Sequence, residues 1–360
     1  MTRGRFLLLL ALGFFLGLGL LVLLPHDRYY RFQEYRLAET RTADWIYERL
    51  HFDDTPIDIA LIGTSRMAGG VSAPALAKAY CALTGRRVRV ANLAIPQFGR
   101  GMDFVIAQEM FRTKTPELVV MQITEVEGRR PHPGFQTLAD ARDILAAPIL
   151  INLGWAEDLA ALPGRQLSLF LKTVLDRPAV AAEFDPRRYA GPDVDRTRSI
   201  PRIDGGVIDR TGTMERERLE RIAAARRAGF TRTYLLPEPL RDLEYRVSHR
   251  YLDRVHAMAR QAGAQVAYAY MPGYGFRGAV PEHVAALAEG FEIWRIHDEV
   301  LGDHWMWLDG NHTNHAGAQV ATQALGRRIA QSHPSLGEAP AGTCDAAPVG
   351  AAASEARSPS

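Results

Sequence analysis

Two short segments near opposite ends of this 360-residue chain carry residue types that could do chemistry together. Ser65 ends the tripeptide Gly63-Thr64-Ser65, which follows an apolar run. Asp309 and His312 lie three residues apart, far downstream. A histidine can take the proton from a serine hydroxyl, and an aspartate can orient the imidazole and stabilise its charged form. The spacing therefore predicts Ser65 as nucleophile, His312 as general acid–base and Asp309 as the orienting residue.

The elements around these residues predict how they are brought together. Apolar runs of strand type alternate with segments of helical pattern, which is typical of a parallel sheet covered on both faces. We expect a three-layer α/β/α sandwich whose mainly parallel sheet has about five strands. A side chain at the carboxyl end of such a strand, like Ser65, faces the crevice where ligands bind. The predicted strands span 57–62, 88–94, 117–124, 265–271 and 292–296, and the helices 72–83, 102–111, 242–262, 281–290 and 314–331, the last capped by Asn314.

The N-terminus predicts a membrane anchor. Residues 6–24 are 19 positions without a charge, about enough to cross a hydrocarbon core of roughly 30 Å. Arg3 and Arg5 precede them and favour a cytoplasmic N-terminus. A cleaved signal peptide is the alternative, but Leu-Leu-Pro-His stands where a small-x-small cleavage site is expected. Either interpretation exports the rest of the chain to the periplasmic or extracytoplasmic side.

The remaining chain divides by composition. We expect the anchor at 1–25, a short helical stalk at 26–55, one domain at 56–331 and a disordered Ala-, Gly-, Pro- and Ser-rich tail at 332–360. Prolines interrupt the pattern at about 128–230, which we interpret as an insertion or lid. The net charge of +2 gives no argument for nucleic acid binding. Cys81 and Cys344 predict no disulfide framework, and we expect a buried small residue and a free tail thiol.

Together the two chemical segments resemble the SGNH, or GDSL-like, hydrolase superfamily. That family carries its serine in a Gly-Asp-Ser-type block after the first strand, and Gly63-Thr64-Ser65 is similar to it. Its second signature often reads Asp-Gly-x-His-x-Asn-x-x-Gly, which residues 309–317 match at every named position. The resemblance covers about 56–128 and 232–330. It implies a three-layer α/β/α fold and an acyl-serine mechanism without a cofactor.

Two blocks depart from the family pattern. A glycine whose amide helps to form the oxyanion hole is replaced here by Gln97, which keeps a backbone N–H. An asparagine of the hole is absent, and Thr124 or Glu125 stands where it is expected. Thr124 could donate a hydrogen bond, but an ionised Glu125 could not. The resemblance therefore implies the amides of Ser65 and Gln97 as oxyanion donors, with Thr124 as a further candidate.

With these departures and its N-terminal anchor, the chain resembles a membrane-bound branch of the superfamily. Members of that branch acylate cell-envelope polymers. That branch implies a polysaccharide substrate and a multi-spanning membrane protein that donates the acyl group. A simple hydrolase stays open as well, because water or a sugar hydroxyl can intercept the same acyl-enzyme. The sequence does not choose between these acceptors.

Two further alternatives are non-esterase functions. A metal site could use His312 and His315 with Asp309, His304 and His297, although no His-Glu-x-x-His pattern is present and we expect no metal. A non-catalytic protein could instead hold a polysaccharide by stacking sugar rings on tryptophans. The candidates for stacking are Trp155, Trp294, Trp305 and Trp307.

Overall fold

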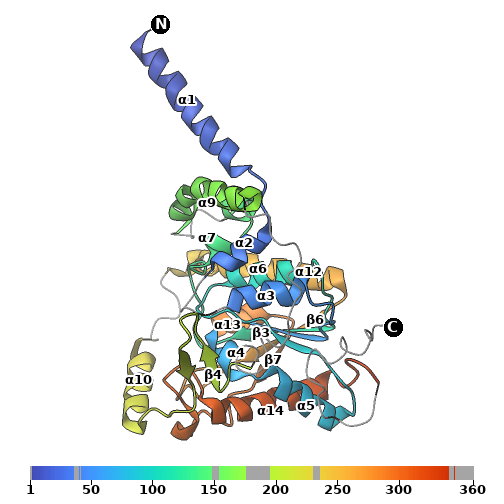
Figure 1. Cartoon of the computed structure of the whole chain (residues 1–360). Coiled ribbons are helices and arrows are strands. Elements are labelled where there is room, and N and C mark those ends of the chain that lie inside the picture. The colour runs from blue at the N-terminus through green and yellow to red at the C-terminus, as the bar shows by residue number, and fades with distance from the viewer. Residues whose placement is uncertain are drawn as a thin grey trace, which may run out of the picture.

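A five-stranded parallel sheet forms the centre of the protein in this computed structural model (Figure 1). The strand order is β2-β1-β3-β6-β7, and every neighbouring pair is parallel. The strands are β1 (Ile59–Ile62), β2 (Val90–Asn92), β3 (Leu118–Ile123), β6 (Gln265–Tyr270) and β7 (Glu292–Arg295). The structure describes residues 2–35, 40, 42–147, 154–175, 195–229, 236–339 and 344. The predicted α/β class with five parallel strands is confirmed.

Helices cover both faces of the sheet. On one face α3 (Thr42–His51), α6 (Arg100–Met110) and α12 (Arg246–Ala262) pack against alternate strand residues such as Ile62 and Met121. On the other, α5 (Ala73–Thr84) and α14 (His315–Ser332) pack against Leu61 and Val120. Because successive side chains of a strand point to opposite faces, both sets must be apolar. This explains why the central strands are continuous apolar runs in the sequence.

The strand order places a topological switch between β1 and β3. The chain passes from β1 to β2 on one side and then crosses to β3 on the other. Ligands of open α/β sheets bind beyond the carboxyl ends of the strands at such a point. The short helix α4 (Ser65–Gly70) begins there, immediately after β1. The topology therefore sets Ser65 at the edge where a ligand site is expected.

Two predicted helices differ in detail from the structure. The segment 242–262 breaks at Tyr245, with α11 (Arg241–Glu244) before it and α12 after it. The segment 281–290 is one turn, α13 (Glu282–Ala285), continued by the 3-10 helix η5 (Ala286–Ala288). A 3-10 helix η4 (Glu238–Leu240) precedes α11. Asn314 caps α14 as predicted, since its side chain accepts from the amide of Gly317 at 3.1 Å.

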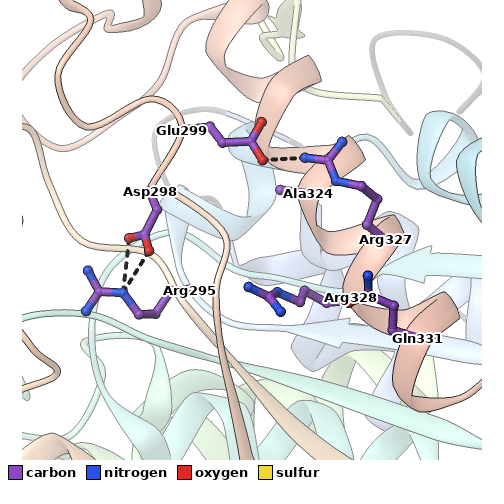
Figure 2. Close-up of a pocket in the computed structure, with 7 residues that line it drawn as sticks. All are labelled: Arg295, Asp298, Glu299, Ala324, Arg327, Arg328 and Gln331. Carbon is purple, nitrogen blue, oxygen red and sulfur yellow. Dashed lines mark hydrogen bonds and ion pairs between the residues drawn. The ribbon is translucent and has the colours of Figure 1, made fainter.

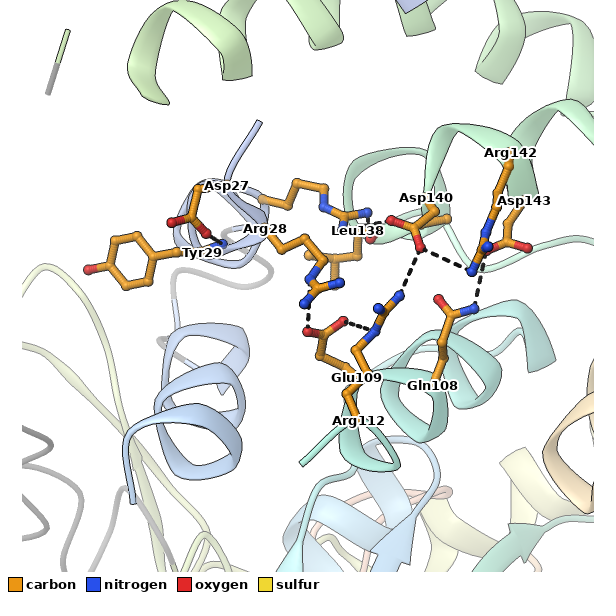
Figure 3. Close-up of polar contacts among 12 residues, drawn as sticks. Asp27, Arg28, Tyr29, Gln108, Glu109, Arg112, Leu138, Asp140, Arg142 and Asp143 are labelled. Carbon is orange, nitrogen blue, oxygen red and sulfur yellow. Dashed lines mark hydrogen bonds and ion pairs between the residues drawn. The ribbon is translucent and has the colours of Figure 1, made fainter. Parts of the chain in front are cut away.

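Residues 26–55 do not form a projecting stalk, so that prediction was wrong. The helix α2 (Arg28–Glu34) and α3 pack against the domain, and Phe32 is fully buried. Arg28 pairs with Glu109 of α6 (Figure 3). Arg31 pairs with Asp140. The mixed periodicity of this segment arises because Arg31 and Arg49 are buried in ion pairs beside apolar neighbours. Residues 36–39 and 41 lie outside the described residues.

The C-terminal segment also differs from expectation. Residues 333–339 are ordered: Leu336 is buried, its amide donates to the hydroxyl of Tyr80, and Glu338 bridges Arg87. Cys81 and Cys344 form a disulfide, with their Cα atoms 5.6 Å apart. The prediction of disorder was therefore wrong for residues 332–339, and the prediction of a free tail thiol was wrong as well. Side-by-side packing of α5 and α14 brings the two segments together, although 263 positions separate the cysteines. Residues 340–343 and 345–360 lie outside the described residues.

The predicted insertion 128–230 has two described parts. One contains α7 (Phe135–Leu138), α8 (Ala141–Leu145) and α9 (Trp155–Leu175), and it lies beside α2. The other contains the antiparallel strands β4 (Ser199–Pro201) and β5 (Val207–Asp209) and the helix α10 (Arg216–Gly229). Leu219 and Ala223 of α10 pack against Tyr274 and Trp307, beside the 309–317 loop. Residues 148–153, 176–194 and 230 lie outside the described part.

The helix α1 (Arg3–Val22) projects from the body of the protein (Figure 1). Its side chains are not buried against the rest of the described structure, and it is long and apolar enough to cross a membrane. A signal sequence has the same properties. Disulfides persist in oxidising compartments outside the cytoplasm. The helix and the disulfide together indicate an extracytoplasmic protein, either secreted or membrane-anchored.

Candidate active site

The three residues singled out in the sequence lie in one hydrogen-bonded chain. The hydroxyl oxygen of Ser65 is 2.8 Å from Nε2 of His312. Nδ1 of the same ring is 2.8 Å from one carboxylate oxygen of Asp309 and 3.0 Å from the other. A nucleophile, a base within hydrogen-bond reach and a group that orients the base are the parts of an activated serine. The side chains of His312 and Asp309 are 23% and 40% exposed, so solvent reaches the site.

The turn that presents Ser65 is fixed by its neighbours in the sheet. A Cβ atom at Gly63 would lie 2.5 Å from the Cβ of Gln122, so only glycine fits there. The side-chain oxygen of Gln122 accepts hydrogen bonds from both the amide and the hydroxyl of Thr64. Asn92 donates to the carbonyls at the end of α4. Ser65 is therefore held by contacts from β2 and β3 as well as from β1.

The Asp309–His312 loop holds its own two side chains together. The amides of Asn311 and His312 donate to Asp309 at 2.7 and 2.9 Å. Burial alone would raise the pKa of Asp309, but the hydrogen bonds from His312 and these amides outweigh it and lower the pKa to about 2. An ionised carboxylate can only accept, so Nδ1 of the neutral imidazole carries the proton. Nε2 then offers its lone pair to the Ser65 hydroxyl.

A buried ion pair connects this loop to the nucleophile turn. Arg66, directly after Ser65, donates to both carboxylate oxygens of Glu125 at the end of β3. The same guanidinium donates to the side chain of Asn311 at 2.8 Å and to the carbonyl of Met271 at 2.9 Å. Glu125 also accepts from the amide of Gly273. Arg66 therefore ties the ends of β3 and β6 to the loop that carries His312.

Glu125 is one of the two residues, with Thr124, for which the sequence resemblance implied an asparagine, and its side chain is engaged in this ion pair. Burial would raise its pKa, but Arg66 outweighs that effect and holds the pKa below its ordinary value. The ionised side chain is an acceptor that already binds Arg66 and Gly273. It cannot donate to a substrate oxygen. The sequence revealed the replacement, but the ion pair with Arg66 was missed because the two residues are 59 positions apart.

Two arginines of the 128–230 insertion also bind the loop that carries Asp309 and His312. Arg210, after β5, donates to the carbonyls of Gly69 and Thr313 at 3.2 and 2.8 Å. Arg226 of α10 donates to the carbonyl of Gly310 at 2.6 Å. Burial lowers the pKa of Arg210 despite the attraction of Asp309. No signal in the sequence identified these two residues, because their targets are backbone carbonyls.

The candidate oxyanion donors differ in availability. The hydroxyl of Thr124 donates to the carbonyl of Val126 at 2.7 Å, which counts against it as a donor to a substrate. The amides of Ser65 and Gln97 donate to no acceptor in the described part of the chain. Gln97 has φ of 79°, and among the described non-glycine residues it alone has a positive φ. Within the described residues, both N–H groups are therefore free of a protein acceptor.

The loop that carries Gln97 runs beside the nucleophile. The amide of Ile95 donates to the carbonyl of Gly63 at 3.0 Å. The guanidinium of Arg66 lies 5.9 Å from the ring centre of Phe98. These two contacts flank Gln97 on both sides in the sequence. The unusual backbone conformation of Gln97 therefore lies between these two contacts, and strained conformations are common at functional sites.

The alternative metal site finds no support in the geometry. His297 is buried, with Nδ1 2.9 Å from the carbonyl of Pro272, and His315 contacts the hydroxyl of Thr197. Within the ranges that the structure describes, no group of three or more His, Cys, Asp or Glu side chains could hold a metal ion. His312 is instead engaged by Ser65 and Asp309. These histidines therefore do not converge with His312.

The tryptophans and the surface hollows lie mostly apart from the triad. Trp294 and Trp307 are buried, Trp155 donates to the carbonyl of Ile144, and Trp305 is 65% exposed on the 3-10 helix η6 (His304–Met306). Figure 2 shows a charged hollow beside α14 in which Arg295 pairs with Asp298 and Arg327 with Glu299. Its lining contains no triad residue: Arg295, Asp298, Glu299, Ala324, Arg327, Arg328 and Gln331. We therefore assign the candidate site to the triad and not to this hollow.

No protein-family model matches this chain, and no curated protein sequence is significantly similar to it. The function must therefore be inferred from the site itself. What the site offers is a serine, a base, an orienting carboxylate and two free amides.

Proposed function

We propose that this protein is an extracytoplasmic serine esterase or O-acyltransferase. The observation that carries the proposal is the continuous hydrogen-bonded chain from Ser65 through His312 to Asp309. Ser65 Oγ attacks an acyl carbonyl while Nε2 of His312 takes its proton. The C–O bond to the leaving alcohol breaks, and His312 returns the proton to that alcohol. An acyl-serine remains.

The second half of the reaction regenerates the enzyme. Water or a sugar hydroxyl attacks the acyl-serine and gives its proton to His312, which passes it back to Ser65. The amides of Ser65 and Gln97 stabilise the oxyanion in both steps. Asp309 keeps Nε2 free to accept protons. No cofactor takes part in this scheme.

We also propose membership of the SGNH-like hydrolases, with α1 as an uncleaved anchor. The family proposal is supported by a serine directly after β1 and an Asp-x-x-His loop directly before α14. The anchor is supported by Tyr30, Arg31 and Phe32, which are buried close after α1 and make it continuous with the folded domain. An anchored enzyme suits an exported polysaccharide as substrate and a multi-spanning membrane protein as acyl donor.

A non-catalytic polysaccharide-binding or assembly role is the second candidate. It is favoured by one observation, since Glu125 replaces the asparagine donor and is locked to Arg66. The exposed Trp305 is a possible stacking surface for a sugar ring. A binder would keep its full function in a Ser65→Ala variant. An enzyme would lose it.

The test uses the full chain in detergent with a fluorophosphonate probe and p-nitrophenyl acetate. We expect covalent labelling of Ser65 and ester turnover in the wild-type protein, and neither in Ser65→Ala. Ser168→Ala is the matched control, because Ser168 is an exposed serine on α9 outside the hydrogen-bonded site. Equal labelling of wild type and Ser65→Ala would refute the assignment. Peptide mapping of the labelled protein would locate the serine that reacts.

A further inference from the structure

The helix α9 presents an apolar face to solvent. Its inner face is buried against the domain through Asp158, Leu162, Gln166 and Leu169. From residue 160 to 175 the most exposed positions are uncharged: Ala160, Ala161, Gly164, Leu167, Ser168, Leu171, Val174 and Leu175. The one charged side chain of this stretch that reaches solvent to a similar extent is Lys172, and it is paired with Glu34 of α2. The uncharged positions recur at helical spacing, so they form one stripe along the helix. Leu175 is 74% exposed.

This stripe lies where α1 leaves the folded domain. The side chain of Gln166 donates to the carbonyl of Val22, the last residue of α1, at 3.1 Å. The hydroxyl of Thr173 accepts from the amide of Asp27 at 3.0 Å. Figure 1 shows α9 between the base of α1 and the body of the protein. Leu23, directly after α1, is 76% exposed, and Leu145 of α8 is exposed as well.

Exposure of these apolar side chains to water costs free energy, and burial in a membrane would remove that cost. Monomeric soluble proteins rarely expose large contiguous apolar patches. A helix with one apolar face can lie in the plane of a bilayer, with that face about 5–10 Å into the headgroup and acyl boundary. With α1 inserted, α9 is already at the depth where this boundary begins. Because Gln166 bonds Val22, the helix α9 lies against the base of the apolar anchor, and this position argues for lipid as the occupant of its exposed face.

We propose that α9 is a second membrane contact, which lies on the outer surface of the bilayer beside α1. The proposal rests on α1 as the anchor, which is part of the proposed function. One transmembrane helix alone would let the domain rotate and tilt. A second, lateral contact fixes its orientation, so that Ser65 stays at a constant height above the lipid. This suits an enzyme that takes an acyl group from a membrane protein.

The test places a tryptophan on the stripe. The five tryptophans of the chain all lie outside α1, so the spanning helix contributes no signal of its own. Full-length Leu171→Trp is reconstituted in phosphatidylcholine vesicles with and without dibrominated acyl chains. The added fluorescence should fall by about half or more in the brominated lipid, since insertion of ~5–10 Å brings the ring within reach of bromine. Iodide in the water should quench it weakly.

Leu83→Trp is the matched control, because Leu83 is an exposed leucine on α5, at the opposite end of the domain (Figure 1). Its added fluorescence should be quenched by iodide and not by brominated lipid. Equal quenching of the two variants by bromine would overturn the proposal. Protection of Leu171→Trp from iodide quenching only when other membrane proteins are co-reconstituted would also overturn it. That result would assign the stripe to a protein partner.

The readout is independent of catalysis. Quenching of Leu171→Trp should be unchanged when Ser65→Ala is added, and ester turnover should be unchanged by Leu171→Trp. Loss of turnover with quenching intact would therefore count against the proposed function alone. Intact mass of the vesicle-bound protein verifies that α1 is present. Equal melting temperatures of the variants and the wild type verify that they fold.

Discussion

The ion pair between Arg66 and Glu125 should be essential for both stability and catalysis. Both side chains are almost fully buried, 3% and 2% exposed, and Arg66 also binds the loop that carries His312. Replacing Arg66 by Met leaves a buried carboxylate without its partner. Breaking a buried pair in this way costs about 3–5 kcal/mol of the free energy of unfolding. Since a domain has only about 5–15 kcal/mol in total, the variant should be close to unfolding.

The double variant Arg66→Met/Glu125→Gln separates stability from activity. Glutamine can still accept from the amide of Gly273 but carries no charge to bury. We expect most of the lost stability to return, because removal of both charges is often nearly neutral. Turnover should not return, since Asn311 still lacks its contact with Arg66. A displacement of His312 by about 1 Å would cost about 10²-fold in kcat.

The assay combines urea unfolding with turnover of p-nitrophenyl acetate in all four proteins of the cycle. The loss in Arg66→Met should shrink as the pH falls, because the unpaired Glu125 then takes up a proton. Arg216→Met is the control, since Arg216 and Glu220 form an exposed pair on α10 and should leave stability nearly unchanged. A loss in Arg66→Met no larger than in this control would refute the reasoning. Wild-type kcat in the double variant would refute the positioning role.

Three further predictions test other parts of the structure. Gln97→Gly should raise stability by about 1 kcal/mol, since glycine adopts the positive φ freely, and should keep ester turnover, because the oxyanion contact is a backbone amide. Asp309→Asn should lower the free energy of unfolding at pH 7, and its difference from wild type should fade as the pH falls from about 4 to about 2. The lowered pKa of Asp309 stabilises the fold only while the carboxylate is ionised. Urea unfolding at several pH values measures this difference, and a difference that stays constant would contradict the prediction. Reduction of the Cys81–Cys344 disulfide should lower the free energy of unfolding by about 2–5 kcal/mol, and a Cys81→Ser variant should be insensitive to reductant.

The sheet and the triad were predictable because their signals are local. A strand buried on both faces must be continuously apolar, and β1, β3 and β6 carry that pattern. Asp309 and His312 meet within one short loop, so their spacing alone is informative. Ser65 needed only the rule that parallel strands present ligands at their carboxyl ends. Each of these inferences uses a span of a few residues.

The errors arose where contacts join distant segments. Residues 26–55 were predicted as a stalk, but Arg28 and Arg31 pair with Glu109 of α6 and with Asp140 at the start of α8. The disulfide depends on α5 and α14 packing side by side. Arg210 and Arg226 bind backbone carbonyls near the site, and every sequence contains such carbonyls. Such pairings follow only from the strand order and helix packing, which a single sequence does not provide.

Under the proposed function, the lack of an asparagine donor at Thr124 or Glu125 has a consequence for the rate. Loss of one oxyanion donor costs about 10²–10³-fold in kcat in serine hydrolases. The remaining amides of Ser65 and Gln97 can support the chemistry, but turnover of a simple ester should be slow. A fluorophosphonate forms its bond once and accumulates, so labelling detects a slow site better than turnover does. Labelled Ser65 with weak ester turnover is therefore the result that the geometry favours, and it would point to a missing donor supplied by the natural substrate or acyl-donating partner.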